Sequence, residues 1–314
     1  MKKILYIVGS TATGKTSLGI KLATKFGAEL ISADSKQIYK DMDIGSGKDI
    51  PKKASKKTSS QNLTYYQIKK TKIWGYDLAD PSQEYSVSHY KKFADSLIKD
   101  IHSRNKLPII VGGSGFYLKC IENPPNSLRV TQNKTLRQKL NKLTTNELQE
   151  RLKNLNKERF NQMNNSDVNN PRRLIRAIEI KLSDTTKEKS ASEKYNSLWI
   201  GLNVAKNEIN ISIKKRVLKR LEDGFEKEFE DLSSSKKLLP NTQASSSMGY
   251  KHWFEYKKGE TTKEEAIKKW TTAEQQYANR QKTWFKKQKE IFWFDAKDEN
   301  SQKSIVQMIK NWYA

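Results

Sequence analysis

The sequence predicts an α/β fold in which a mostly parallel β-sheet is flanked by helices on both faces. Short apolar runs alternate with amphipathic helical patterns, as is typical of parallel strands joined by helical crossovers. A glycine-rich loop directly follows the first apolar run, and a purely helical block interrupts the alternation midway along the chain. The expected buried strands are residues 4–8, 28–33, 107–111, 198–204 and 291–294.

A chain of 314 residues exceeds the usual size of one domain, so we expect an α/β core carrying a smaller unit. We assign residues 1–122 to the first part of the core, 123–168 to a helical insertion, and 169–314 to the second part. Leucines at helical spacing between 135 and 156 predict two helices, the second capped by Thr144 and Glu147. Asn170 and Pro171 supply the cap and first turn of a helix that ends near Leu182.

Three further segments complete the prediction. Long helices are expected at 207–232 and 263–289, and the apolar stripe of the second, which includes Tyr277, is interpreted as core. Residues 51–73 are rich in Lys, Ser and Thr, and only 65–68 resembles a strand, so we expect a solvated surface insertion that could form a hairpin.

The charge of the chain indicates a polyanionic partner. Sixty Lys and Arg residues against 35 Asp and Glu residues give a formal charge of +25. Clustered cations bind phosphates and release counterions, which favours nucleic acid as the partner. The alternative is a lysine-rich surface that is simply solvated. The motifs must decide between the two.

Other residue types exclude several classes of site. Cys120 is the one cysteine, so the chain has no internal disulfide and no thiolate metal cluster, as expected in the reducing cytoplasm. Three histidines make a histidine metal site a poor hypothesis. The first apolar run is too short for a signal peptide, and no run reaches the length of a membrane-spanning helix, so we expect no membrane partner.

A phosphate-binding motif, G-x-x-x-x-G-K-[ST], lies between the first strand and a helix. Its residues are Gly9, Ser10, Thr11, Ala12, Thr13, Gly14, Lys15 and Thr16. Glycines let the backbone N–H groups and the helix N-terminus face an anion, Lys15 adds positive charge, and the Thr16 hydroxyl can bind Mg²⁺. The motif does not specify the ligand, because it would hold a diphosphate leaving group as readily as a nucleotide such as ATP.

Asp34 follows the second predicted strand and therefore lies at the same edge of the sheet as the phosphate-binding loop. A carboxylate there can take a proton from a nucleophile or hold a magnesium-bound water. The alternative is a helix cap for the residues that follow.

Five blocks of sequence, together with the phosphate-binding loop, resemble the tRNA dimethylallyltransferase family of bacterial type. The blocks are residues 32–45, 108–118, 171–179, 248–251 and 277–285, and their order and spacing cover nearly the whole chain. The resemblance implies a P-loop NTPase-like core with a helical insertion that binds tRNA. A channel would let the two substrates approach from opposite ends.

The resemblance also implies the reaction and the roles of its residues. Dimethylallyl diphosphate would donate its prenyl group to the exocyclic amine (N6) of the adenosine 3′ to the anticodon. The loop would hold the diphosphate with Mg²⁺, and Asp34 would orient the amine and take its proton. Ser114, where the family usually has threonine, would contact the reacting groups.

By the same resemblance, a further set of residues is expected to contact the anticodon stem-loop. Arg172, Arg173 and Arg176 share one face of their helix, opposite its apolar residues, and the arginine fork suits phosphate. The full set is Ser35, Lys36, Gln37, Arg137, Arg172, Arg173, Arg176, Met248, Gly249, Tyr250, Lys251, Arg280 and Gln281.

Some positions depart from the family pattern. Asn170 stands where aspartate is usual, Ser212 replaces a common arginine, and a histidine often found before Asp77 is missing. The insertion at 51–73 is also atypical. No zinc-finger extension follows the last predicted strand, so we expect the compact bacterial architecture, as a monomer.

Three alternative functions stay open from the residues. In a small-molecule kinase, ATP would occupy the loop and Asp34 would activate a hydroxyl. An adenine-nucleotide isopentenyltransferase would prenylate free nucleotides. An RNA-binding module would carry a degenerate nucleotide pocket, although Lys15, Thr16 and Asp34 are all present.

Overall fold

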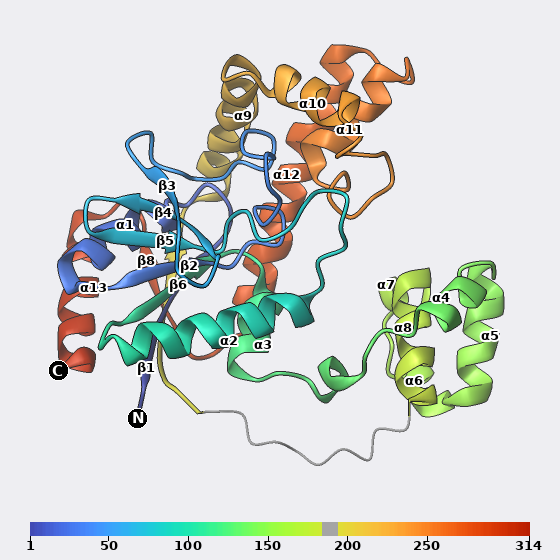
Figure 1. Cartoon of the computed structure of the whole chain (residues 1–314), viewed down its shortest axis with the longest axis horizontal. Coiled ribbons are helices and arrows are strands. Elements are labelled where there is room, and N and C mark those ends of the chain that lie inside the picture. Colours follow the sequence, from blue (N-terminus) through green and yellow to red (C-terminus); the bar gives the residue numbers. More distant parts are fainter. Residues whose placement is uncertain (184–193) are drawn as a thin grey trace. The chain divides into compact units, whose positions relative to one another are not determined.

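The structure is a computed structural model that describes residues 1–183 and 194–314 (Figure 1). The chain divides into two compact units. The α/β unit consists of Met1–Glu122 and Lys194–Ala314, and the helical unit is Asn123–Glu193. No helix in the described ranges is both long enough and apolar enough to cross a bilayer.

An eight-stranded sheet forms the centre of the α/β unit, in the order β3-β4-β5-β2-β6-β1-β7-β8. The strands from β5 to β8 in this order run parallel, and β4 runs antiparallel to both of its neighbours, β3 and β5. All five predicted strands are confirmed. The bounds are β1 Lys3–Gly9, β2 Glu29–Ser32, β3 Ser55–Thr58, β4 Thr64–Ile68, β5 Thr71–Trp74, β6 Pro108–Gly112, β7 Asn196–Asn203 and β8 Ile291–Asp295.

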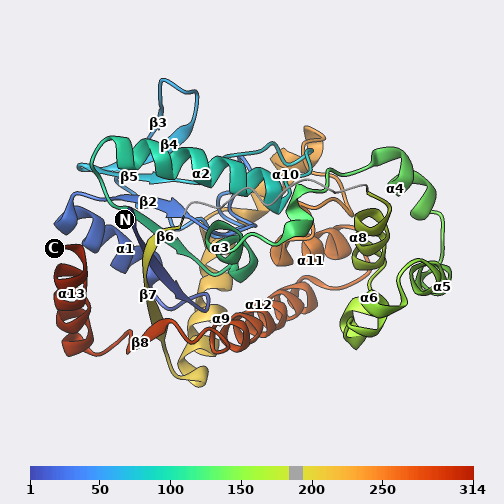
Figure 2. The same ribbon diagram turned by 90° about the horizontal axis from the view of Figure 1, so that it is seen from below.

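Helices cover both faces of this sheet, as predicted. Successive residues of β1 point to opposite faces, so Leu5 and Ile7 pack with α1 and α13, while Ile4 and Tyr6 pack with α2, α3 and α12. Figures 1 and 2 show α1 and α13 on the same side of the α/β unit. The helices are α1 Lys15–Phe26, α2 Val87–Ser103, α3 Gly115–Glu122, α9 Lys206–Glu222, α10 Phe225–Ser234, α11 Met248–Lys257, α12 Lys263–Phe285 and α13 Glu299–Tyr313.

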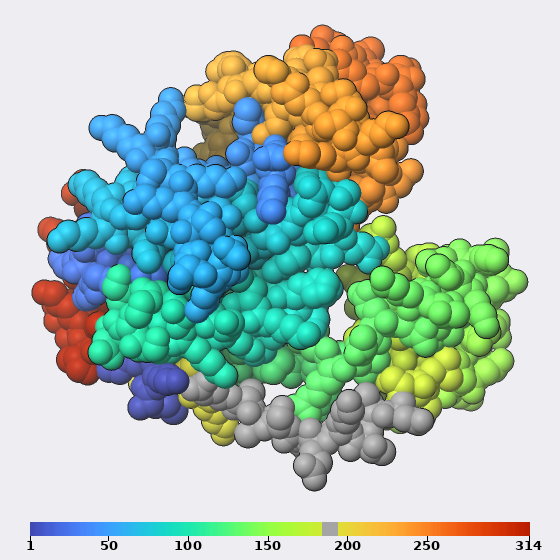
Figure 3. Space-filling view, viewed as in Figure 1, coloured from blue at the N-terminus to red at the C-terminus, as the bar shows by residue number. Residues whose placement is uncertain are grey.

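Residues 51–73 form the expected hairpin, but they are not only a surface insertion. Strand β3 is exposed along its whole length, and Figures 2 and 3 show the hairpin projecting from the α/β unit. Tyr66 of β4 and Ile73 of β5 are buried, however, and β5 pairs in parallel with β2. The hairpin therefore extends the central sheet, because β4 pairs with β5 and β5 pairs with β2.

Two predicted helix boundaries are wrong. The segment 207–232 is not one helix, because Gly224 adopts a left-handed backbone with φ of 102° and separates α9 from α10. The helix predicted to reach residue 289 ends at Phe285.

The helical unit contains five α-helices and one 3-10 turn among its described residues. They are the turn η1 Asn126–Arg129, then α4 Lys134–Leu140, α5 Thr145–Leu155, α6 Lys157–Asn161, α7 Asn165–Val168 and α8 Pro171–Leu182. The capping box of Thr144 and Glu147 and the Asn170 cap are both confirmed.

Helix α8 corrects the predicted domain boundary at 168/169, which had placed this helix in the second part of the core. Its buried Leu174 and Ile178 pack with Leu140, Leu148 and Leu152 of α4 and α5. The apolar stripe of α8 closes the core of the small unit, so the insertion extends beyond residue 168.

Glu179 is the polar centre of the helical unit. Its buried carboxylate accepts hydrogen bonds from the Asn133 backbone amide at 2.7 Å, the Arg137 guanidinium at 2.8 and 3.0 Å, and Arg176. Arg176 also donates to the carbonyl of Val130 at 2.8 Å. Burial alone would raise the pKa of Glu179, but its arginine partners hold that pKa below its ordinary value.

Arg137 and Arg176 therefore hold the helical unit together, whereas Arg172 and Arg173 are exposed. Arg173 pairs with the carboxylate of Asp167. Of the three arginines predicted to share one helix face, Arg172 and Arg173 therefore face solvent, and Arg176 contacts the buried Glu179.

We predict that Arg176→Gln destabilises the helical unit by about 1–3 kcal/mol, because a buried carboxylate loses a charged partner. Arg172→Gln is the matched control and should change stability by no more than about 0.5 kcal/mol. Hydrogen–deuterium exchange of peptides from 134–182 measures the difference. Equal protection in the two variants would contradict the structural role of Arg176.

Candidate functional site

The phosphate-binding loop joins the carboxyl end of β1 to the N-terminus of α1. A Cβ atom on Gly9 would lie 2.6 Å from the carbonyl oxygen of Leu202, so only glycine fits there. Gly14 caps α1 with φ of 81°, and Thr13 Oγ1 donates to the Ser10 carbonyl at 2.9 Å. The loop therefore presents the N-terminus of α1 to an anion, as the motif predicts.

Helix α12 holds this loop through the side chain of Gln281. The Gln281 Oε1 atom accepts from the Thr11 amide at 2.8 Å, and its Nε2 atom donates to the Gly113 carbonyl at 3.0 Å. Ser10 Oγ donates to the Ala278 carbonyl at 3.1 Å. Gln281 was expected to contact RNA, but its buried amide instead joins the ends of β1 and β6.

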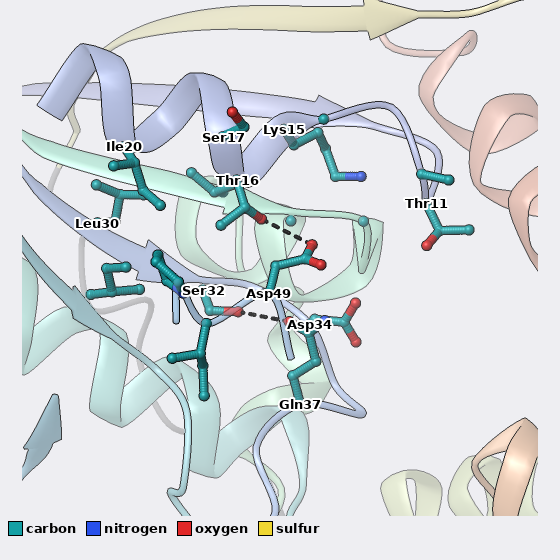
Figure 4. A pocket seen from close by; sticks show the side chains of 18 of the residues that line it. Thr11, Lys15, Thr16, Ser17, Ile20, Leu30, Ser32, Asp34, Gln37 and Asp49 are labelled. Carbon is teal, nitrogen blue, oxygen red and sulfur yellow. Dashed lines mark hydrogen bonds between the residues drawn. The ribbon is translucent and has the colours of Figure 1, made fainter. Parts of the chain in front are cut away.

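A cavity of about 560 Å³ opens beside the loop (Figure 4). Figure 4 shows Lys15 and Thr16 of α1, Asp34 after β2 and Asp49 of a later loop around it, and Arg216 also lines it. Apolar and aromatic side chains form a further part of the wall: Ile20, Leu30, Ile50, Pro51, Ile68, Ile73, Tyr76 and Val111. Polar side chains, among them Ser17, Lys21 and Ser32, also line the cavity. The cavity thus joins a cationic phosphate cradle to an apolar surface.

Lys15 is the principal cation of the loop. Its ammonium group donates to the Ser10 carbonyl. Burial lowers the pKa of Lys15 to about 8, although the nearby carboxylates of Asp49 and Asp34 oppose this shift. A phosphate ligand would favour the charged form, so ligand binding and protonation of Lys15 are coupled.

Asp34 lies at the carboxyl end of β2 and is not a helix cap. The residues that follow form turns, and Asp34 Oδ1 accepts from the Lys36 amide at 2.9 Å. Burial raises the pKa of the Asp34 carboxyl, while that amide and the charges of Lys15 and Lys36 oppose the rise. A carboxylate with a raised pKa is a stronger base, which suits the predicted role in proton transfer.

Ser114 connects the ends of two strands next to Asp34. Its hydroxyl accepts from the Ser35 amide at 3.0 Å and lies 3.3 Å from the Ser35 hydroxyl. Tyr277 of α12 also belongs to this group: burial and the charge of Asp34 raise its pKa, and hydrogen bonds with Ser114 and Gln281 oppose this. Sequence reasoning missed Tyr277 because its spacing matched the apolar stripe of α12.

Thr16 faces Asp49, a second residue that sequence reasoning missed. Thr16 Oγ1 donates to Asp49 Oδ2 at 3.3 Å, and Arg216 donates to Asp49 Oδ1 at 3.1 Å. The hydroxyl and carboxylate are hard oxygen donors of the kind that Mg²⁺ prefers, so the expected metal fits these residues. Among the described residues, no group of three or more His, Cys, Asp or Glu side chains is arranged to hold a metal ion. Ligand oxygens would have to complete the site.

Two of the expected RNA-contacting residues near Asp34 are engaged within the protein. Lys36 Nζ donates to Ser246 Oγ at 2.8 Å, and Gln37 Nε2 donates to the Gly47 carbonyl at 2.8 Å. Gln37 also lines the cavity. Both side chains fix the loops that border the site.

The block at 248–251 is divided between core and surface. Tyr250 is fully buried and donates to Glu228, which also accepts from the backbone amides of residues 43–45. A Cβ atom on Gly249 would lie 2.7 Å from the Trp270 ring. The core encloses both residues, so the Tyr250 side chain is not presented at the surface. The expected RNA contact of Gly249 and Tyr250 stays a prediction. Lys251 and, on α12, Arg280 are exposed, and Met248 is half-buried.

Departures from the family pattern also have places in the structure. Asn170 caps α8 by accepting from the Arg173 amide, and Ser212 lines the cavity. Asp77 accepts from the Tyr66 hydroxyl at 2.7 Å and pairs with Lys48 and Lys56. The hairpin thus supplies partners for Asp77.

We predict that inorganic diphosphate binds more weakly as the pH rises through about 8, because the Lys15 ammonium is then lost from the free protein. Above that pH the affinity should fall by up to about tenfold per pH unit. Calorimetric titration of wild type beside Lys15→Arg tests this, since arginine stays protonated and the ionisation of the ligand is common to both. Parallel pH profiles for the two proteins would exclude Lys15 as the titrating group.

Comparisons with known proteins identify the family of this chain. A family model described as IPP transferase matches residues 37–288. The tRNA dimethylallyltransferase of Anoxybacillus flavithermus is 33% identical over 307 residues, which cover 95% of this chain and 92% of that protein.

Solved structures give the same result. The tRNA isopentenylpyrophosphate transferase of Bacillus halodurans has a TM-score of 0.70 at 30% identity, covering 99% of this chain and 97% of that one. A eukaryotic dimethylallyltransferase acting on tRNA has a TM-score of 0.78 at 26% identity, covering 99% and 80%. The chain is therefore a transferase with a P-loop NTPase-like fold, and it belongs to the IPP transferase family.

Proposed function

We propose that this protein transfers a dimethylallyl group from dimethylallyl diphosphate to N6 of the adenosine 3′ to the anticodon in tRNA. The allylic C–O bond breaks and a C–N bond forms. The electron pair of the broken bond leaves with diphosphate, and the amine loses one proton. The names of the relatives support this function over phosphoryl transfer to a small molecule.

The observation that carries the proposal is the composition of the cavity. Its phosphate-binding loop suits a diphosphate, and its apolar wall suits a five-carbon prenyl chain. Burial of apolar surface stabilises the bound chain by about 25 cal/mol per Å². Asp34 stands at the edge of the same cavity, where the amine would approach.

The side chains of this site divide the chemistry between leaving group and nucleophile. Lys15 and Arg216 place positive charge where the diphosphate gains negative charge. Asp34 accepts a hydrogen bond from the amine, and then its proton, as the C–N bond forms. An adenine amine is a weak nucleophile, so its placement by Asp34 and the neighbouring Ser114 contributes more than basicity does.

We further propose that Mg²⁺ binds with the donor, held by the Thr16 hydroxyl and by diphosphate oxygens. The bound ion would neutralise charge on the leaving group. The loop itself orients the diphosphate through the N-terminus of α1.

Several observations support tRNA as the acceptor. One solved relative is described as acting on tRNA, and the charge of this chain is +25. Arg172, Arg173, Lys251 and Arg280 present exposed cations that suit phosphates. We propose that the protein works as a monomer in the cytoplasm, where Cys120 would remain a buried thiol.

The direct test is incubation with dimethylallyl diphosphate and unmodified tRNA, followed by mass spectrometry of the nucleosides. Free AMP in place of tRNA tests the adenine-nucleotide isopentenyltransferase. ATP with small hydroxyl compounds tests the kinase. Prenylated AMP without prenylated tRNA, or phosphorylated products alone, would overturn the proposal, and tRNA binding without any product would indicate an RNA-binding module.

We predict that Asp34→Asn lowers the single-turnover rate of transfer by about 10²–10⁴-fold, the usual contribution of a positioned general base. Binding of tRNA and of the donor should be retained, because asparagine keeps the size and a hydrogen-bonding oxygen. A rate within a few-fold of wild type would remove Asp34 from the mechanism.

We predict that Arg172→Gln with Arg173→Gln weakens tRNA binding and lowers the slope of log K against log salt by roughly 0.7–0.9 per lost phosphate contact. Arg176 is left intact because it stabilises the helical unit. The control is Lys303→Gln with Lys310→Gln on α13, which removes the same charge elsewhere. Filter binding across a salt series should show equal slopes for the control and wild type. Equal slopes for all three proteins would exclude the arginine pair as a phosphate contact.

A further inference from the structure

We infer that Asp49 is the carboxylate ligand of the divalent cation, which it binds together with Thr16 and the diphosphate. This inference rests on the proposed function, in which a diphosphate occupies the phosphate-binding loop. It adds a residue that lies outside the phosphate motif and outside the group around Asp34 and Ser114.

The two oxygens are already arranged as neighbouring ligands would be. Thr16 Oγ1 and Asp49 Oδ2 are 3.3 Å apart and both line the cavity. Adjacent oxygens around octahedral Mg²⁺, each about 2.1 Å from the metal, lie about 3.0 Å from each other. Figure 4 shows this pair beside Lys15, on the side of the cavity formed by α1.

The segment that carries Asp49 is fixed in place by its neighbours. Lys48 is fully buried and donates to the Tyr39 carbonyl and to Asp43, both at 2.6 Å, and to Asp77. Gly47 has φ of 65°, and its carbonyl accepts from Gln37 at 2.8 Å. The residue that follows these contacts is therefore held at the cavity rather than on a loose loop.

The other carboxylate in the cavity is less suited to the metal. Asp34 accepts from the Lys36 amide and stands beside Ser35 and Ser114, where the nucleophile is expected. The Asp49 side chain is 46% exposed, so substrate oxygens and water can reach it. The two carboxylates thus serve different partners.

The pairing of Asp49 with Arg216 does not by itself explain this placement. Arg216 Nη2 lies 3.1 Å from Asp49 Oδ1, and the pair is partly exposed, so it adds little to the stability of the fold. A cation bound by Asp49 would compete with Arg216 for the carboxylate. Arg216 would then be available to the diphosphate.

The test measures how much a divalent ion tightens the binding of inorganic diphosphate. The dissociation constant is determined by calorimetry without divalent ions and with Mn²⁺. Their ratio, the metal enhancement, is compared among wild type, Asp49→Asn and the control Asp223→Asn. Asp223 is an exposed carboxylate that pairs with Lys219 and does not line the cavity beside the loop. The metal ion also binds diphosphate in free solution, but this association is the same in all three titrations and does not affect the comparison.

We expect Asp49→Asn to lower the Mn²⁺ enhancement by about tenfold or more, the usual loss for one ligand of a metal site. Its metal-free affinity for diphosphate should be at least that of wild type, which shows that the loop is folded. Asp223→Asn should match wild type. An enhancement within twofold of wild type in Asp49→Asn would overturn the inference.

A second variant separates ligation from a simple charge effect. Asp49→Cys places a thiolate at the same position, and thiolates favour Cd²⁺ over Mn²⁺. The protein has one other cysteine, the buried Cys120, so no exposed thiol competes. We expect the ratio of Cd²⁺ to Mn²⁺ enhancement to rise about tenfold or more over wild type. An unchanged ratio would show that Asp49 acts only through its charge.

These measurements contain neither tRNA nor a prenyl donor. The inference about Asp49 can therefore fail while dimethylallyl transfer proceeds. Conversely, the absence of transfer with intact metal enhancement would reject the proposed function and retain the metal site.

Discussion

The site depends on one buried amide, that of Gln281. This side chain joins the backbone of the phosphate-binding loop at Thr11 to the backbone after β6 at Gly113. Parallel strands bring these ends to the same edge of the sheet, but loops alone would not hold a fixed spacing between them. Because Gln281 makes both bonds away from solvent, a change in either loop would leave a buried polar group unpaired. Helix α12 thereby sets the distance between the phosphate cradle and the turn that carries Ser114.

The two carboxylates in the cavity differ because their surroundings differ. Asp34 is half-buried at a strand end, and desolvation raises the pKa of its carboxyl, which favours a role in proton transfer. Asp49 is more exposed and contacts a hydroxyl and a guanidinium, which favours a role with cations. The same side chain can thus serve the nucleophile in one place and the leaving group in another. The two carboxylates occupy different places because the proposed reaction releases a proton from the amine and a diphosphate from the prenyl carbon.

The helical unit combines a small apolar core with a buried ion-pair cluster. A unit of this size has a small apolar core, here built from leucines and isoleucines of α4, α5 and α8. Glu179 adds a buried charge, and Arg137 and Arg176 compensate it. Arg137 and Arg176, which were expected to contact RNA, therefore form ion pairs within the helical unit. The sequence pattern of α8 does not distinguish the exposed Arg172 and Arg173 from Arg176, because it does not show that Arg176 pairs with the buried Glu179.

The sequence by itself determined the elements whose signals are local. The phosphate-binding motif, the five buried strands, the Thr144 capping box and the position of Asp34 after β2 all follow from spacing along the chain. Local signals also determined the family, because its motifs are contiguous blocks.

Tertiary structure decided every role that depends on a partner distant in the sequence. Gln281 and Tyr277 meet the loops because α12 packs against them, and Asp49 meets Thr16 because contacts of Lys48 and Gly47 hold its segment at the cavity. Helix α8 joined the inserted helices because its apolar stripe fits their leucines. Contacts of this kind leave no periodic pattern or fixed spacing in the sequence. They form between residues that are far apart in the chain, so they become visible only when the packed structure is known.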